Sequence, residues 1–355
     1  MKKGIALLLS LVLVVGMLSG CSGSSTSSSS ASSAPVQVAE TSESSASTAE
    51  KLVIQVAHAA AENDDSFHHK NALFFKQYVE ELSNGTIEIE IVGNAQLGGE
   101  RDYVEGMQLG TIEMASTANM VLSNFDPRFA VFDLPYLFKD YETAYKVLDS
   151  DVVAELIESF AAEGGVRVLA FHNGGFRQFV GNVAINTAAD MKGVKVRVPE
   201  SDIYIDTFAA LGANPTPLAY NDTFTALQQG TVDAFEIAPS VVLSDGFYEV
   251  YSDLSIINHL YAPAPFMISE SLYQSLTAEQ QEIISKAAKM AAADERAWFE
   301  AGEAGVLSRL QENGMKIDTP DIAEFQAVVA ASGLYEKYEA KIGEELFTSI
   351  QELCK

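Results

Sequence analysis

Hydrophobic and polar positions follow two different periods along the chain, and their alternation predicts strands separated by helices. Residues 86–92 (TIEIEIV) carry an apolar side chain at every second position, which is typical of a strand with one exposed face. Residues 67–83 carry apolar side chains at close to helical spacing, and Asn84-Gly85 is a suitable helix end. Because strands that alternate with helices indicate parallel sheets, we expect an α/β fold.

The same patterns predict the other elements of the chain. The expected strands are 52–57, 86–92, 111–116, 166–171, 176–181, 194–198 and 266–269. The expected helices are 67–83, 100–109, 140–150, 151–163, 201–211, 220–229 and 277–313. The last helix contains no proline and begins with a capping box made by Thr277 and Gln280. At 1.5 Å per residue it would extend roughly 50 Å, so we expect it to run along two domains and tie them together.

Residues 1–50 differ from the rest of the chain in composition. Lys2-Lys3 precedes an apolar run from Ile5 to Leu18, which is too short for a comfortable membrane span and has the length of a signal-peptide core. The run ends in Leu18-Ser19-Gly20-Cys21, which resembles the bacterial lipobox. We therefore predict a lipoprotein signal peptide over residues 1–20. The alternative is a plain signal peptide in which the cysteine is incidental.

In the lipoprotein interpretation, cleavage leaves Cys21 as an acylated N-terminal residue that anchors the protein to the cell membrane. Serine makes up 13 of the 29 residues in 22–50, and such a segment buries too little apolar surface to fold. Residues 21–50 are therefore expected to be the lipidated cysteine and a disordered tether. The second cysteine, Cys354, then has no partner for an internal disulfide, so the hydrophobic core must hold the fold together.

The charge of the chain excludes one large class of partners. Its 355 residues are enough for two domains, and 49 acidic residues outnumber 22 basic ones, which gives a net charge of −27. Nucleic-acid binding requires lysine and arginine to neutralise phosphate, so we expect no nucleic-acid partner. An anionic membrane surface would also repel the protein, unless the lipid on Cys21 holds it there.

No motif of the chain indicates catalysis. The sequence contains no Gly-x-Ser-x-Gly elbow, no phosphate-binding P-loop, no Gly-x-Gly-x-x-Gly dinucleotide motif and no His-Glu-x-x-His. The adjacent His68 and His69 cannot both face one metal ion on a helix, because that would need a spacing of four residues. We therefore expect neither an enzyme nor a metal ion or organic cofactor.

Two arginines on predicted strands carry the strongest chemical signal. Arg177 and Arg197 lie 20 residues apart, and in 194–198 (VKVRV) the valines share one face while Lys195 and Arg197 share the other. An arginine on an inner strand is costly unless it is paired. The residue types leave two interpretations open. Each arginine either pairs with one of the many carboxylates of the chain or offers its planar guanidinium to the carboxylate of a ligand.

Several motifs in order and in register resemble those of a known family over nearly all of residues 51–320. They are 94–114 (NAQLGGERDYVEGMQLGTIEM), 131–138 (VFDLPYLF), 190–199 (DMKGVKVRVP), 211–220 (LGANPTPLAY), 224–236 (FTALQQGTVDAFE) and 247–250 (FYEV). Each motif alone is weak, but their combination is specific. The chain resembles the DctP-type solute-binding proteins of tripartite ATP-independent periplasmic (TRAP) transporters.

This resemblance implies a two-lobed, periplasmic-binding-protein-like fold of the type II-like kind, with crossing strands and a long helix that joins both lobes. Lobe I would comprise residues 51–174 with about 263–302, and lobe II about 175–262 with 303–355. The implied function is to capture an organic acid outside the membrane, in the cleft between the lobes, and to deliver it to a TRAP-type permease driven by an ion gradient. The protein would be extracytoplasmic, held at the bacterial cell membrane as a lipoprotein.

The resemblance also implies roles for individual residues. Arg197 aligns with the arginine that binds the ligand carboxylate and determines selectivity in the family, and Arg177 aligns with a second arginine that often assists. Tyr220 falls where an aromatic ring commonly lies against the ligand, although core packing would also explain it. Further candidates for the cleft are Glu100, Glu236, His58 and Asn119, of which the two glutamates have the alternative role of pairing with an arginine.

Two departures from the family pattern bear on the ligand. Where the family often has Glu-Asn-Pro, this chain has Glu236-Ile237-Ala238-Pro239, so Ile237 replaces a polar ligand contact by an apolar one. Where sialic-acid binders carry an amide after Arg-Val-Pro, this chain has Glu200. Glu200 either accepts hydrogen bonds from ligand hydroxyls or caps the helix that begins near Ser201. Both changes speak against sialic acid and leave four-carbon dicarboxylates, sugar acids and other short or aromatic monocarboxylates open.

Two rival functions also stay open at this point. One is a receptor for a cationic solute, with Glu100, Glu200 and Glu236 as anchors. The other is a sensory lipoprotein that passes a signal, and not a solute, to its membrane partner.

Overall fold

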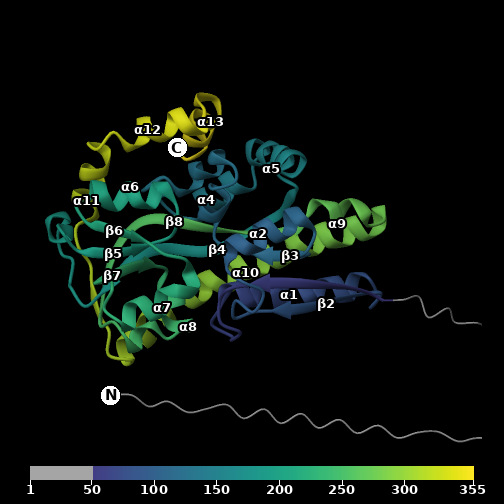
Figure 1. Ribbon diagram of the computed structural model, residues 1–355, viewed down its shortest axis with the longest axis horizontal. Helices are drawn as coiled ribbons and strands as arrows, with labels where there is room; N and C mark the ends of the chain where they lie inside the picture. The colour runs from purple at the N-terminus through teal and green to yellow at the C-terminus, as the bar shows by residue number, and fades with distance from the viewer. Residues whose placement is uncertain (1–50) are drawn as a thin grey trace, which may run out of the picture. The chain divides into compact units, whose positions relative to one another are not determined.

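The computed structural model describes residues 51–355, so the predicted signal peptide, the lipid on Cys21 and the tether lie outside the described residues. The described part is a mixed α/β structure around a nine-stranded sheet (Figure 1). The strand order is β2-β1-β3-β8-β4-β7-β5-β6, and β9 pairs with β8. Within this part of the chain, no helix has both the length and the apolar character that crossing a membrane requires.

The strands are β1 (Leu52–His58), β2 (Ile87–Val92), β3 (Met114–Ser116), β4 (Val166–Gly181), β5 (Lys195–Val198), β6 (Asn214–Pro217), β7 (Ala234–Ile237), β8 (Asp253–Ser269) and β9 (Lys316–Asp318). The α-helices are α1 (Phe67–Leu82), α2 (Glu100–Leu109), α3 (Asn119–Leu122), α4 (Tyr141–Leu148), α5 (Asp151–Gly164), α6 (Asp202–Ala210), α7 (Tyr220–Gln228), α8 (Pro239–Ser244), α9 (Glu270–Ser275), α10 (Ala278–Glu312), α11 (Ile322–Ala330), α12 (Leu334–Ile342) and α13 (Glu344–Leu353). Short 3-10 helices are η1 (Pro127–Asp133), η2 (Ala188–Met191) and η3 (Phe247–Glu249). Every helix predicted from the sequence is present, with ends displaced by at most two residues.

The prediction of separate strands at 166–171 and 176–181 is wrong, because both belong to the continuous strand β4. The apparent break is Gly174-Gly175. A Cβ atom on Gly174 would lie 2.4 Å from the carbonyl oxygen of Ala262, and Gly175 has a φ of +80°. The pairing of β4 with β8 shifts its register between Asn173 and Phe176. The glycines therefore let two long strands cross closely and bend without ending.

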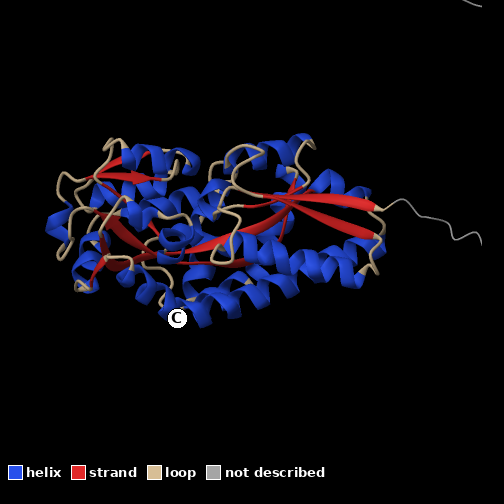
Figure 2. Cartoon of the chain, turned by 90° about the horizontal axis from the view of Figure 1, so that it is seen from below, coloured by secondary structure: helices blue, strands red, loops and turns tan. Residues whose placement is uncertain are grey.

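Strands β4 and β8 are shared by two groups of strands, which explains how the sheet serves two lobes. Strands β2, β1 and β3 are parallel, and β3 pairs with the end of β8. Strands β6, β5 and β7 are parallel as well, and β7 pairs with the end of β4. Figure 2 shows long strands that connect the two groups. The expected crossing strands are thus confirmed, although the sequence had located only the last four residues of β8.

Helix α10 is the long connecting helix that the sequence predicted. It begins after Thr277, whose side chain accepts a hydrogen bond from the Gln280 N–H while the Gln280 side chain accepts one from the Thr277 N–H, which forms the expected capping box. The helix packs in turn against α1, the middle of β4, and α8. It therefore contacts elements of both strand groups.

Three hydrophobic clusters form the core. One lies under α1 and the start of α10, a second lies among α7, α8 and the start of β8, and the largest lies on the other side of the sheet. In the largest cluster, α11 packs against α6, whereas α13 packs against α4 and α5. The C-terminal helices thus contact elements that the sequence placed in different lobes. The proposed lobe boundaries, which put 303–355 wholly in lobe II, stay a prediction.

Candidate functional site

A cavity of about 240 Å³ lies between the two groups of strands, beside the crossing of β4 and β8. Gly174 and residues 262–264 line it at the crossing itself. One side is formed by the loop after β1 and by the first residues of α1 and α2. The other side is formed by the ends of β5 and β7 and by the first residues of α7.

Helix starts and the ends of parallel strands converge on this cavity. Helices α1, α2 and α7 all begin at its wall, at Ser66–His68, Gly99–Asp102 and Ala219–Asn221. The unpaired N–H groups of a helix start, together with the helix dipole, favour a negative charge nearby. The backbone therefore makes a locally favourable place for an anion, although the chain as a whole is strongly acidic.

Arg197 on β5 is buried in this wall, and no carboxylate of the described residues forms an ion pair with it. Its side chain is 2% exposed, and its Nε and Nη2 atoms donate to the Leu218 carbonyl oxygen at 3.1 and 2.6 Å. Burial lowers the pKa of Arg197 to about 10, the charge of Glu236 offsets this only in part, and the like charge of Arg177 lowers the pKa further. All seven arginines lie within residues 51–355, and Arg197 is the only one that forms no ion pair with a residue of that range.

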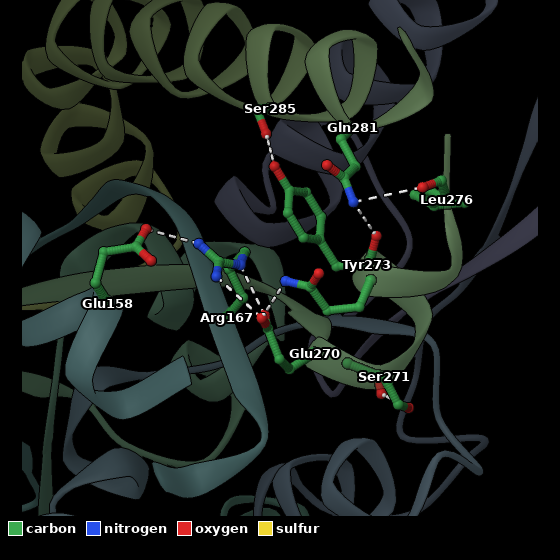
Figure 3. A network of polar contacts seen from close by, with 10 residues as sticks. Glu158, Arg167, Glu270, Ser271, Tyr273, Leu276, Gln281 and Ser285 are labelled. Carbon is green, nitrogen blue, oxygen red and sulfur yellow. Dashed lines mark hydrogen bonds and ion pairs between the residues drawn. The ribbon is translucent and has the colours of Figure 1, made fainter. Parts of the chain in front are cut away.

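Arg167, which also lies on a strand, differs from Arg197 because it is paired with carboxylates of the protein. Its guanidinium on β4 pairs with Glu158 at 2.7 Å and with Glu270 at 2.7 and 3.0 Å (Figure 3). Nearby, Tyr273 and Gln281 connect α9 to the start of α10. Arg197, which forms no ion pair within residues 51–355, thus contrasts with the paired arginine in Figure 3.

Arg177 also lines the cavity, but its charge is already neutralised. Its Nη2 atom lies 2.7 Å from Glu236 Oε1, Nε contacts Oε2, and His259 Nε2 lies 3.1 Å from the same carboxylate. Burial by itself would raise the pKa of Glu236, but Arg177 and His259 outweigh it and hold the pKa below its usual range. Glu236 is fully buried behind Arg177 and does not line the cavity.

Glu100 and Glu200 give the cavity carboxylate groups on opposite sides. Glu100 Oε1 accepts a hydrogen bond from the Ala118 N–H at 2.8 Å. Burial raises the pKa of Glu100, and the Ala118 N–H and the charge of Arg197 offset this only in part. Glu200 lines the cavity at the end of β5, and its side chain makes no hydrogen bond within the described residues. Both groups are suited to accept hydrogen bonds from hydroxyl groups.

The structure brings six of the nine ligand-binding candidates together around the cavity. They are Arg197, Arg177, Tyr220, Glu100, Ile237 and Glu200. The Tyr220 hydroxyl donates to Asp245, which holds the ring at the wall. The role of each residue in binding stays a prediction.

Three candidates lie away from the cavity wall. Glu236 stands behind Arg177, as described above. The His58 ring lies against His69, with Nε2 to Nδ1 at 3.1 Å, and does not line the cavity. The Asn119 amide donates to the Phe129 carbonyl oxygen and to Asp133, which turns it into the core.

Sequence reasoning missed four polar residues that helix starts and loops contribute to the cavity. His68, Ser66, Asn124 and Asn221 all line the cavity. Ser66 accepts from the His69 N–H as the N-cap of α1, so a search for helix caps beside the predicted strand ends would have found this segment. Residues 51–355 contain no group of three or more His, Cys, Asp or Glu side chains placed to hold a metal ion.

The fold and the site together define the class of two-lobed solute-binding proteins. The features that define it are two crossing strands, a long joining helix, and a cleft with helix starts and an unpaired arginine in its wall. A family model described as "Bacterial extracellular solute-binding protein, family 7" (DctP) matches residues 56–341. The chain belongs to this family, the solute-binding proteins of TRAP transporters. The expectation drawn from the motifs of the sequence is thereby confirmed.

Individual relatives agree with this assignment. A solute-binding protein of Verminephrobacter eiseniae is 35% identical over 280 residues, 78% of this chain and 83% of the relative. The C4-dicarboxylate-binding periplasmic protein DctP of Rhodobacter capsulatus is 32% identical over 243 residues, 67% of this chain and 71% of the relative. Like the family, both are named for binding solutes and not for catalysis.

Solved structures are similar over nearly their full length. A TRAP solute-binding protein from a Polaromonas species, bound to D-erythronate, has a TM-score of 0.81 and 32% identity, and the match covers 85% of this chain and 98% of that one. A Haemophilus influenzae protein with bound L-gulonate has a TM-score of 0.80 and 31% identity, covering 85% of this chain and 100% of that one. The two-lobed α/β fold is confirmed by these neighbours.

Proposed function

We propose that this protein is an extracytoplasmic receptor that captures a sugar acid in the cavity between its lobes and delivers it to a TRAP-type permease. The observation that carries the proposal is the buried Arg197, which lines the cavity and has no carboxylate partner among residues 51–355. A ligand carboxylate would supply the missing counter-ion through paired, charge-assisted hydrogen bonds. In a water-poor cavity such a pair is far stronger than on the surface.

The charge balance of the cavity supports a monocarboxylate over a dicarboxylate. Arg197 is available to one carboxylate, whereas Arg177 is already neutralised by Glu236. A second ligand carboxylate would meet Glu100 and Glu200, and like charges in a desolvated site repel strongly. The same two groups, with Asn124 and Asn221, suit hydroxyl groups. D-erythronate and L-gulonate, bound by two structural neighbours, combine one carboxylate with several hydroxyls.

A thermal-shift screen of residues 51–355 tests this substrate class. We expect D-erythronate, L-gulonate or another sugar acid to raise the unfolding midpoint, and succinate at equal concentration to have a smaller effect or none. A ligand present at 100 times its dissociation constant adds about 2.7 kcal/mol to the stability. For a chain of this size that corresponds to a shift of roughly 2–4 °C. Stabilisation by polyamines alone would instead support a receptor for cations, and stabilisation by succinate alone a dicarboxylate receptor.

We further propose that lipid on Cys21 anchors the receptor outside the cell membrane, and that lobe closure over the ligand creates the surface that the permease recognises. The lipobox-like residues 18–21 and the serine-rich segment after them support the anchor. Cys21→Ala should move the protein from the membrane fraction to the soluble or secreted fraction of cells, while Cys354→Ala should not. If Cys21→Ala stays in the membrane fraction as wild type does, the anchor is not the lipid.

A further inference from the structure

We infer that His68 is a ligand-binding residue of this cavity, and that Ser116 and His172 hold its ring so that Nε2 meets a hydroxyl group of the bound acid. The inference rests on the proposed function. It adds a contact from the lobe opposite Arg197, at a position for which the sequence considered only metal binding.

His68 lines the cavity, and only one of its two ring nitrogens has a hydrogen-bond partner among residues 51–355. His68 is the second residue of α1, lines the cavity and is 7% exposed. Nδ1 lies 2.7 Å from Ser116 Oγ. Nε2 makes no hydrogen bond with residues 51–355, and unlike Nδ1 of His172 it is not sealed off from solvent. The ring is also held by Phe67, whose centroid lies 4.1 Å away.

Ser116 joins His68 to a second buried imidazole. Its Oγ lies 2.7 Å from His172 Nε2 as well, and both residues are fully buried. A serine hydroxyl has a single hydrogen, so it donates to one ring and accepts from the other. When both rings are neutral, only one of the two nitrogens that face Ser116 carries a hydrogen. The tautomer of His68 is therefore coupled to that of His172.

Both rings are neutral at physiological pH. Burial lowers the pKa of His172 to about 3 and that of His68 well below its usual value. The positive end of the α1 dipole also disfavours a cation at His68. His68 therefore offers a single neutral N–H or lone pair at Nε2, and does not compete with Arg197 for the ligand carboxylate.

A hydroxyl group is the ligand group that fits such a nitrogen best. A carboxylate only accepts hydrogen bonds, so it can pair with just one tautomer of His68, whereas a hydroxyl both donates and accepts. Arg197 extends from β5 and His68 from α1, on opposite sides of the cavity. A sugar acid that binds Arg197 by its carboxylate and His68 by a hydroxyl would thus connect the two lobes.

Calorimetric titration of His68→Phe tests the contact, with His69→Phe as the matched control. His69 is the next residue of α1 and contacts His58 away from the cavity. The probe is whichever of D-erythronate, L-gulonate and D-galactonate raises the unfolding midpoint most in the thermal-shift screen. The same titration is made with the forms of that acid that each lack one hydroxyl group. We expect His68→Phe to weaken binding of the parent acid about tenfold, which corresponds to the free energy of one hydrogen bond. Wild type should bind the parent acid more tightly than the deoxy form that lacks the contacted hydroxyl, and His68→Phe should abolish this preference. His69→Phe should keep the wild-type affinity for the parent acid and the preference for it over that deoxy form.

The outcomes separate this inference from the proposed function. If His68→Phe lowers the affinity for the parent acid and for every deoxy form by the same factor, His68 makes no contact with a hydroxyl group. The same conclusion follows if the affinity for the parent acid is unchanged. If wild type binds none of the acids, the sugar-acid proposal itself fails and the inference fails with it.

The positioning role of Ser116 has a spectroscopic test. With only five histidines in the chain, selective ¹⁵N labelling resolves the ring nitrogens. Wild type should show His68 in one dominant tautomer, and Ser116→Ala should give a mixture of tautomers with a smaller loss of affinity than His68→Phe. A mixture already present in wild type, or an unchanged His68 signal in Ser116→Ala, would overturn the coupling.

Discussion

Replacing Arg197 with alanine should weaken binding of the organic acid by roughly 2–5 kcal/mol, the cost of removing one partner from a buried charge pair. This corresponds to an increase in the dissociation constant of about 30-fold to 4,000-fold. The reason is that Arg197 is the one arginine that pairs with no carboxylate of residues 51–355, so we expect the ligand to supply its counter-ion. Isothermal titration calorimetry with the best acid of the thermal screen measures the change.

The stability of the unliganded protein provides a second readout for Arg197. A buried charge without a partner destabilises a fold, so Arg197→Met should unfold at the same temperature as wild type or higher, while losing the ligand. Arg197→Lys is the matched control, because it keeps the charge but not the planar fork, and it should bind with intermediate affinity. If Arg197→Ala binds the acid as tightly as wild type, the assignment of the site is wrong.

Glu236→Ala should lower the free energy of unfolding by about 3–5 kcal/mol, because it leaves Arg177 as an uncompensated buried charge. The matched control is Glu158→Ala, which removes a carboxylate that is 65% exposed beside Arg167 and should cost less than about 1 kcal/mol. Urea titration of the unliganded variants measures both values. If both variants lose the same free energy of unfolding, the Arg177–Glu236 pair stabilises the fold no more than an exposed ion pair does.

The same pair predicts a dependence of stability on pH. The folded protein holds the pKa of Glu236 below its usual value, so ionised Glu236 stabilises the fold fully above the unfolded pKa of about 4.3. This contribution is lost as the pH falls through the lower folded pKa. Wild type should therefore lose its advantage over Glu236→Gln as the solution is acidified. An advantage that persists unchanged far below pH 4 would contradict the pairing.

The helices were predictable because their information is local. Helix α10 carries both its capping box and its continuous pattern within residues 277–313. The long strands were not, because Gly174-Gly175 resembles a break until the crossing with β8 supplies a reason for it. Strand β6 (Asn214–Pro217) contains two prolines and has no alternating pattern, so only its pairing with β5 identifies it.

The same limit applies to the site. The sequence pattern indicated both Arg177 and Arg197 as candidates, but it did not show which of them is paired within the protein. That depends on the pairing of Phe179 on β4 with Glu236 on β7, which brings Arg177 and Glu236 within reach of each other although they are 59 positions apart in the chain. His58 was chosen because it ends a strand, whereas the cavity is reached by His68 at a helix start. Such a placement follows from the loop geometry and not from periodicity.

The most direct test of the account is a crystal structure of residues 51–355 with the bound acid. We predict that the ligand carboxylate accepts hydrogen bonds from the Arg197 guanidinium at about 2.7–2.9 Å, inside the cavity between the lobes. Arg177 should keep its pairing with Glu236. A ligand bound elsewhere, or an Arg197 that pairs with a carboxylate of the protein while the acid is bound, would contradict the central claim.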